Sequence, residues 1–187
     1  LHEGEVTRID VCTANDIPFF NVAGVGYDAR VAHDFAKKPG RGFITYVQSV
    51  LQQWNGYKPS KYKITTPTGS FKKKALLISF ANGSQFGNNA FIAPNASVSD
   101  GLMDVSILEK FPGRAVPVVA MQLFSKHIED SRYSDIFRTN EITIKQKSKK
   151  VHLDGEPFKL GKKIHFKVLP GALNILAPKV FEDGFNT

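Results

Sequence analysis

The sequence predicts a mainly β protein, a β-sandwich with two or three helical insertions. Three observations favour this class. Short stretches rich in β-branched and aromatic residues recur along the 187 residues, and turn signals separate most of them. Only two long stretches repeat apolar residues at the helical period. The regular alternation of strand and helix that a parallel, doubly wound sheet requires is missing over most of the chain.

In the first half of the chain, strands are predicted at residues 5–13 and 17–22, joined as a hairpin by a turn at Asn15-Asp16. The glycines of residues 23–28 predict a turn that opens a short helix at 28–35. A second helix is predicted at 43–55, because its apolar residues form one stripe at the helical period. That stripe, interpreted as core, is Phe43, Val47, Val50, Leu51 and Trp54. Strands at 61–66 and 71–80 follow.

The second half is predicted to contain more strands than helix. The strands are expected at residues 103–108, 141–147, 150–153, 163–168 and 173–176. A helix is predicted at 114–127, and its apolar face is expected to carry Val118, Val119, Met121, Leu123 and Phe124. Residues 129–138 are ambiguous, and Asp154-Gly155 is a hairpin signal. We expect one domain over residues 1–178 and a tail at 179–187.

Composition limits the class further. Hydrophobic residues make up 42% of the chain, enough for a sizeable core, and the single cysteine, Cys12, excludes an internal disulfide. The net charge of +8 favours phosphates, nucleic acid or an acidic membrane surface as partners. The longest apolar run has ten residues, well short of the roughly 20 that span a membrane. The N-terminus has neither an initiator Met nor a signal-peptide pattern, which predicts a fragment that lacks an N-terminal partner.

The segment at residues 81–104 is the predicted working loop. A loop of roughly 20 residues inside a compact domain is usually functional or disordered. Phe86, Phe91 and Ile92 give this one apolar anchors that a disordered linker lacks. Its last part, residues 97–102, can fold as a turn that points the Asp100 carboxylate and main-chain carbonyls at a hard cation, Mg²⁺ or Ca²⁺. A plain Asp-Gly turn is the alternative. The histidines lack the spacing of zinc ligands.

A second candidate site is the sequence HLDGEP at residues 152–157. In an extended strand, Asp154 and Glu156 share one face, and the repulsion between two carboxylates can produce a usable general base. A charged hairpin tip is the alternative. Nucleic-acid binding is not favoured, because the aromatic residues do not interleave with the lysine runs as stacking platforms do.

Three stretches together resemble the diacylglycerol kinase-like lipid kinases, a family that includes bacterial diacylglycerol kinases, sphingosine kinases and ceramide kinases. The stretches are FFNVAGVGYDARVA, ANGSQFGNNAFIAPNASVSDGLMDVSIL and HLDGEP, in the family's order and spacing. The resemblance covers residues 5–178. It implies the C-terminal, lipid-binding β-sandwich of the NAD-kinase/diacylglycerol-kinase-like fold. The N-terminal nucleotide-binding domain, with its GGDGT loop, is absent from this chain.

The resemblance also implies roles for single residues. Asp100 would bind a structural Mg²⁺, and Ser97 and Leu102 would add main-chain carbonyls. Glu156 is favoured as the base that takes the proton from the lipid hydroxyl, with Asp154 beside it.

Asn82 and Gly83 match the Asn-Gly pair that opens the family's central loop and shapes the cleft. Where the family usually has two or three glycines after that pair, this chain has Gly87-Asn88-Asn89.

The implied function is that of an ATP-dependent lipid kinase acting on diacylglycerol or a related lipid. ATP would be bound mainly by the N-terminal domain, so this chain by itself is expected to be inactive. The implied partners are the lipid substrate, an anionic membrane surface and the N-terminal domain, and the implied location is cytoplasmic and peripheral to the membrane. The alternative from another class is a non-catalytic basic β-sandwich that binds anionic membrane or nucleic acid.

Overall fold

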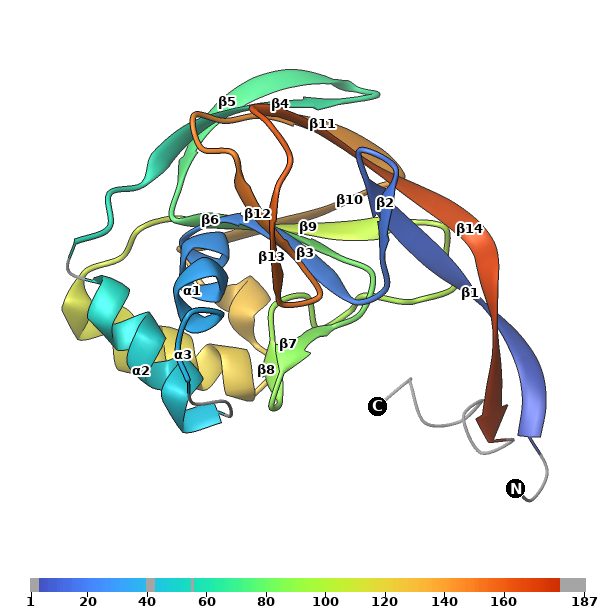
Figure 1. The fold of residues 1–187 in the computed structure, drawn as a ribbon, viewed down its shortest axis with the longest axis horizontal. Helices are drawn as coiled ribbons and strands as arrows, with labels where there is room; N and C mark the ends of the chain where they lie inside the picture. Colours follow the sequence, from blue (N-terminus) through green and yellow to red (C-terminus); the bar gives the residue numbers. More distant parts are fainter. Residues whose placement is uncertain (1–3, 40–42, 55, 179–187) are drawn as a thin grey trace.

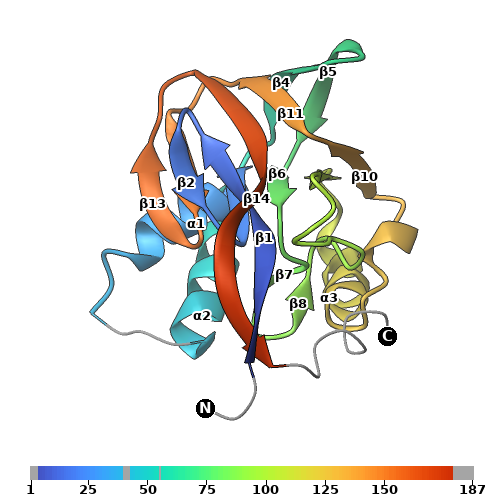
Figure 2. The same ribbon diagram turned by 90° about the vertical axis from the view of Figure 1, so that its right-hand side faces the viewer.

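The computed structural model describes residues 4–39, 43–54 and 56–178. These residues form two six-stranded antiparallel sheets that lie face to face, a short two-stranded hairpin and a layer of helices (Figures 1 and 2). The helices lie below the second sheet in Figure 1, so the layers run sheet, sheet, helix. The predicted β-sandwich with helical insertions is confirmed.

The first sheet has the order β2-β1-β14-β11-β4-β5 and the second has the order β10-β9-β6-β3-β12-β13. The first contains β1 (Gly4–Ala14), β2 (Ile17–Phe19), β4 (Ser60–Thr66), β5 (Gly69–Ala75), β11 (Glu141–Lys145) and β14 (Lys163–Pro178). The second contains β3 (Val22–Gly26), β6 (Leu77–Ala81), β9 (Met103–Leu108), β10 (Ser134–Thr139), β12 (Lys150–Leu153) and β13 (Glu156–Lys159). The hairpin is β7 (Gln85–Gly87) and β8 (Ala90–Phe91). The helices are α1 (Tyr27–Phe35), α2 (Phe43–Trp54), α3 (Val116–Phe124) and the 3₁₀ turns η1 (Gly113–Ala115) and η2 (Ile128–Asp130).

The main core lies between the two sheets. Alternate residues of the strands point into it, and the rings of Phe80 and Phe166, one from each sheet, stack with centroids 3.7 Å apart. Phe19 meets Phe166 edge to face at 6.3 Å. Cys12 is fully buried in this core. Burial of large apolar side chains from both sheets is therefore what holds the sandwich together.

Three strand predictions are wrong in how the chain is divided. Residues 17–22 were expected as one strand, but they belong to β2 and β3, which lie in different sheets. Residues 71–80 likewise divide at Leu76 into β5 and β6. The chain crosses between sheets at both places without glycine or proline, so no sequence signal marks the corner. Residues 163–168 and 173–176, in contrast, belong to the single strand β14.

The helices α1 and α2 form where they were expected. Val50 and Trp54 of α2 pack against the outer face of the second sheet, whereas Leu51 is 62% exposed, so it is wrong as a core residue. Residue 55 and the side chains of Phe43 and Val47 lie outside what the structure describes.

The helix α3 is shorter than predicted and is oriented differently. A 3₁₀ turn precedes it, and it stops before Lys126, whose φ is +64°. Of its residues only Val119 is buried. Val118, Met121 and Phe124 are exposed, so the residues predicted as one apolar face do not all face the core. Within the described part of the chain, no helix is long and apolar enough to cross a membrane.

Candidate active site

The turn between β12 and β13 is the centre of the candidate site. Asp154 and Gly155 take left-handed conformations, with φ of 49° and 84°. This geometry turns the Asp154 carboxylate back toward the connection between β2 and β3. There it accepts three backbone hydrogen bonds, from the N–H groups of Phe20, Asn21 and Val22, at 2.8, 2.9 and 3.0 Å. The side chain therefore fixes the turn to the corner where the chain crosses between sheets.

Glu156 begins β13, opposite Leu153. It is exposed, and among the described residues its carboxylate makes no hydrogen bond. The expectation that Asp154 and Glu156 share the face of an extended strand is wrong, because the left-handed turn separates them. One carboxylate is held by the backbone, and the other is open to an incoming molecule.

A buried pair lies behind this turn. His152 Nε2 is 3.1 Å from Asp28 Oδ2, and both side chains are almost fully buried. The Gly155 N–H approaches His152 Nδ1 at 3.4 Å, which corresponds to the tautomer with its proton on Nε2. A Cβ on Gly24 would lie 2.0 Å from Asp28 Oδ2, so this pair depends on the glycine.

The sequence interpretation did not include the Asp28–His152 pair. The available signals were the histidine directly before Leu153-Asp154 and the aspartate directly after the glycines of residues 24–26.

Asn82 and Gly83 lie at the same corner. The Asn82 amide is fully buried and donates to the main-chain oxygens of Asp10 and Phe20, at 3.1 and 2.9 Å. The Gly83 N–H donates to the Asn21 carbonyl, and a Cβ on Gly83 would lie 2.4 Å from Asn21 Oδ1. The structure thus places the predicted pair beside the Asp154 turn, in contact with the connection between β2 and β3.

The β7–β8 turn contains Asn88 and Asn89, the residues that stand where the family resemblance predicted glycines. Asn88 and Asn89 both take positive φ, 49° and 59°. Asparagine tolerates this region better than most residues with a side chain.

The predicted metal turn, residues 97–102, is held by a residue that the sequence interpretation missed. Asp10 is 2% exposed, and its two carboxylate oxygens accept the N–H groups of Gly101 at 2.7 Å and Gly171 at 2.8 Å. Its own N–H donates to the Val98 carbonyl. A charged residue in the middle of a strand with apolar neighbours was the available signal.

Asp10 and Asn82 join the two candidate sites. The Asp10 carboxylate holds the 97–102 turn, and its carbonyl accepts the Asn82 amide, which also binds the Phe20 carbonyl. The Phe20 N–H in turn binds Asp154. Hydrogen bonds therefore run without a break from the Gly101 turn to the Asp154 turn.

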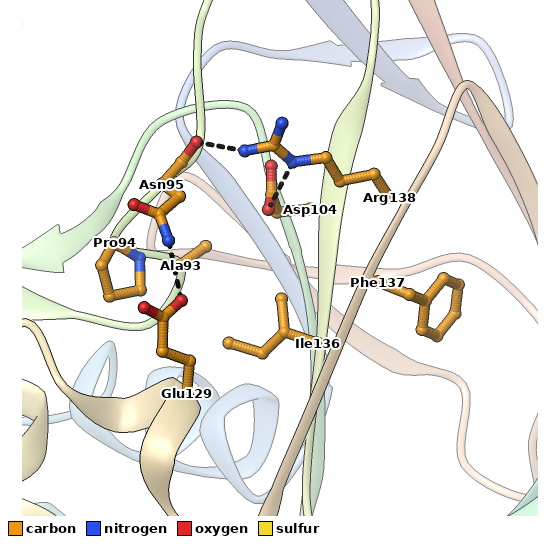
Figure 3. Close-up of a pocket in the computed structure, with 8 residues that line it drawn as sticks. All are labelled: Ala93, Pro94, Asn95, Asp104, Glu129, Ile136, Phe137 and Arg138. Carbon is orange, nitrogen blue, oxygen red and sulfur yellow. Dashed lines mark hydrogen bonds and ion pairs between the residues drawn. The ribbon is translucent and has the colours of Figure 1, made fainter. Parts of the chain in front are cut away.

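Arg138 lies beside the 97–102 turn, in a pocket of about 410 Å³ (Figure 3). Its guanidinium contacts Asp104 Oδ1 at 3.2 Å and the Asn95 carbonyl at 2.6 Å, and it is 3.8 Å from Asp100 Oδ2. Burial raises the pKa of the Asp104 carboxyl, and the charge of Arg138 opposes that rise.

The 97–102 turn offers oxygen atoms of the main chain and of the Asp100 side chain. In the described ranges no group of three or more His, Cys, Asp or Glu side chains is arranged to hold a metal ion, so a site here would rest on main-chain oxygens. Neither the Ser97 nor the Leu102 carbonyl accepts a backbone hydrogen bond from the described residues. The Asp100 carboxylate accepts the Leu102 N–H at Oδ1, and its Oδ2 lies 3.8 Å from Arg138. Oxygen donors of this kind are what Mg²⁺ and Ca²⁺ prefer.

The fold and the site define the class of this protein, which is an antiparallel β-sandwich domain. In it, one hydrogen-bonded network joins an acidic hairpin turn to a loop with oxygen donors. The family follows from comparison with known proteins. Residues 21–177 match the model of the YegS C-terminal NAD kinase beta sandwich-like domain. The chain belongs to this family, and the predicted resemblance to the C-terminal domain of diacylglycerol kinase-like proteins is confirmed.

Two relatives are bacterial. The chain is 33% identical over 178 residues to the "Probable lipid kinase YegS-like" of Shewanella frigidimarina, covering 94% of this chain and 57% of that protein. It is 29% identical over 182 residues to the "Probable lipid kinase YegS" of Salmonella arizonae, covering 94% and 58%. The chain thus spans less than two thirds of the length of these relatives.

Two solved structures share the fold. One is a diacylglycerol kinase from Bacillus anthracis, with a TM-score of 0.67 and 18% identity, covering 94% of this chain and 56% of that one. The other is the NAD kinase from Archaeoglobus fulgidus in complex with ATP, with a TM-score of 0.51 and 13% identity, covering 97% and 59%.

Proposed function

We propose that this chain is the C-terminal domain of an ATP-dependent lipid kinase that phosphorylates a hydroxyl group of diacylglycerol or a related lipid. Its family and relatives named as lipid kinases support this proposal. The observation that carries it is the β12–β13 turn, where three backbone hydrogen bonds fix Asp154 and leave the neighbouring Glu156 carboxylate open. Phosphoryl transfer to an alcohol needs such a positioned acceptor for the hydroxyl proton.

The two acidic residues of the turn have different roles in this proposal. Glu156 accepts the proton from the lipid hydroxyl. Asp154 is a positioning residue, because its oxygens are already occupied by the backbone of residues 20–22. The buried Asp28–His152 pair supports the turn from behind. This refines the expectation that Asp154 is itself catalytic.

The nucleotide and the metal have separate places in the proposal. ATP supplies the phosphoryl group and is bound mainly by the N-terminal domain of the parent. A structural Mg²⁺ is proposed at the carbonyls of Ser97 and Leu102 and the carboxylate of Asp100. Through Asp10 and Asn82 this turn is joined to the corner that holds Asp154, so order in one is transmitted to the other.

The charge of the chain suits the proposed lipid substrate. The net charge of +8 attracts the protein to an anionic lipid surface. We therefore propose a cytoplasmic protein that associates peripherally with the membrane.

Glu156→Gln in the full-length parent tests the catalytic assignment. The amide cannot accept the proton, so turnover on a panel of lipids should fall by about 10²- to 10⁴-fold, the usual contribution of general acid–base catalysis. Melting temperature should not change, because Glu156 is exposed and makes no hydrogen bond among the described residues. Asp130→Asn, an equally conservative change at another exposed carboxylate, is the control. Undiminished turnover of the Glu156 variant would exclude the assignment. Vesicle or oligonucleotide binding by an inactive parent would favour the binding module instead.

Asp100→Ala tests the metal proposal by stability. Millimolar Mg²⁺ should raise the melting temperature of the unmodified chain, because a ligand that binds only the native state stabilises it. The variant should lose that increase. Ser99→Ala, one residue away in the same turn, is the control. An identical response to Mg²⁺ in the unmodified chain and the Asp100 variant would contradict the proposal.

A further inference from the structure

The helix α3 is apolar on both sides. Val116 and the buried Val119 pack inward against the core below the second sheet. On the outer side, Val118, Met121 and Phe124 are 52%, 63% and 50% exposed. A surface helix normally has polar side chains outward, and an exposed apolar patch marks an interaction surface. We call Val118, Met121 and Phe124 the outer face of α3.

Positive charges border this face. No charged residue lies between Arg114 and Lys126, which flank α3. The Lys126 ammonium lies over the Phe91 ring, 5.0 Å from its centroid. Two acidic residues follow: Glu129, whose carboxylate accepts a hydrogen bond from Asn95 in the neighbouring pocket (Figure 3), and the exposed Asp130. An apolar centre with basic residues at its edges is the pattern of segments that lie in the interface of an anionic bilayer.

The position of α3 in the molecule also suits a lipid surface. Figure 1 places α3 at one end of the longest axis, whereas the β1–β14 ribbon, with Gly4 and Pro178, ends at the other. A domain joined ahead of Gly4 would therefore attach far from α3.

We propose that the outer face of α3 inserts into the headgroup region of an anionic bilayer. This inference rests on the proposed function in one respect, which is that the substrate is a bilayer lipid. The contact itself requires only the apolar face and the bordering cations, so it is testable on this chain without any catalysis.

Flotation with lipid vesicles tests the contact directly. The 187-residue chain is mixed with vesicles of phosphatidylcholine, with or without phosphatidylglycerol. The double variant Met121→Ser/Phe124→Ser should bind the anionic vesicles about tenfold more weakly or worse, because two apolar side chains no longer leave water. The control is Val6→Ser/Leu176→Ser, which removes two side chains of similar exposure, 71% and 61%, from the ribbon. Equal binding by the two double variants would overturn the proposal.

A thiol-reactive, polarity-sensitive dye at Met121→Cys gives a second readout. The native Cys12 does not compete for the dye, because it is fully buried and burial raises its pKa to about 12. The emission should shift to the blue with anionic vesicles, and the dye at Val6→Cys should not respond. If the Met121 dye is already shielded in the vesicle-free parent, another domain covers the face. If the chain self-associates and the α3 double variant does not, a second copy covers it. Either result would overturn the proposal.

Activity of the full-length parent separates this proposal from the proposed function. The α3 double variant should lose activity on vesicle-borne diacylglycerol but keep it on a short-chain, water-dispersed diacylglycerol. A parent active on both lipids whose isolated chain does not bind vesicles would refute the α3 contact alone. A parent inactive on every lipid, with vesicle binding that depends on α3, would refute the kinase proposal alone.

Discussion

Removal of the Asp154 carboxylate should destabilise the domain strongly, although the side chain is exposed. Asp154→Ala breaks three hydrogen bonds, to the N–H groups of Phe20, Asn21 and Val22. With a discount for exposure, each is worth about 1 kcal/mol, giving a loss of about 3 kcal/mol. Alanine at a φ of 49° adds about 1 kcal/mol of backbone strain. The total of about 4 kcal/mol corresponds to a drop in melting temperature of about 8–16 °C for a domain of this size.

A matched control separates the hydrogen bonds from the strain. Asp16 is also an exposed aspartate at positive φ, 67°, and its carboxylate makes no hydrogen bond among the described residues. Asp16→Ala should therefore cost only the backbone term of about 1 kcal/mol. Asp154→Asn keeps one acceptor oxygen, so its loss of stability should lie between those of Asp154→Ala and Asp16→Ala. The assay is thermal unfolding followed by circular dichroism. If Asp154→Ala and Asp16→Ala lower the melting temperature equally, the carboxylate does not hold the corner.

Two further predictions concern buried charges. Gly24→Ala would place a Cβ 2.0 Å from Asp28 Oδ2, whereas in Gly56→Ala the Cβ would have no neighbour within 4 Å. The melting temperature of the Gly24 variant should therefore fall far more than that of the Gly56 variant. Equal melting temperatures of the two variants would contradict this prediction. Arg138→Gln should destabilise the chain more at pH 7 than near pH 4, as measured by urea unfolding at both pH values. Burial raises the folded-state pKa of Asp104, so its ionisation costs stability as pH rises above the unfolded value of about 4, and without Arg138 that cost grows. A pH-independent effect would mean that Arg138 does not stabilise the ionised Asp104.

Local pattern was sufficient for the strands that stay in one sheet and end at a turn. Met103–Leu108 and Lys150–Leu153 have the predicted bounds, and Asp154-Gly155 forms the predicted turn. Lys150–Leu153 ends at Asp154, whose φ of 49° changes the backbone direction. No glycine or proline marks the corners at residues 20–21 and at Leu76. Residues that become buried lie before and after each corner, so the strand pattern continues through it. Only the packing of two sheets decides where the chain crosses.

The outward orientation of α3 had no local signal either. Both of its sides are apolar, so hydrophobic periodicity does not tell which side faces the core. The structure decides this through Val119 and Val116, which pack inward, while Met121 and Phe124 remain exposed.

The candidate site shows most clearly what the sequence leaves open. The motifs at Asn82, Asp100 and Glu156 were recognisable separately, but the residue that joins them, Asp10, stands alone in a strand, and its partners Gly101 and Gly171 lie 91 and 161 positions away. A carboxylate that is 2% exposed is costly to bury, and here the cost is offset by two backbone N–H donors that only the folded chain supplies. Asp10 is therefore stable only where the two glycine turns meet, and its burial requires both to be in place. The separate motifs act as one unit for this reason, since a shift of either turn leaves a buried charge without its partner.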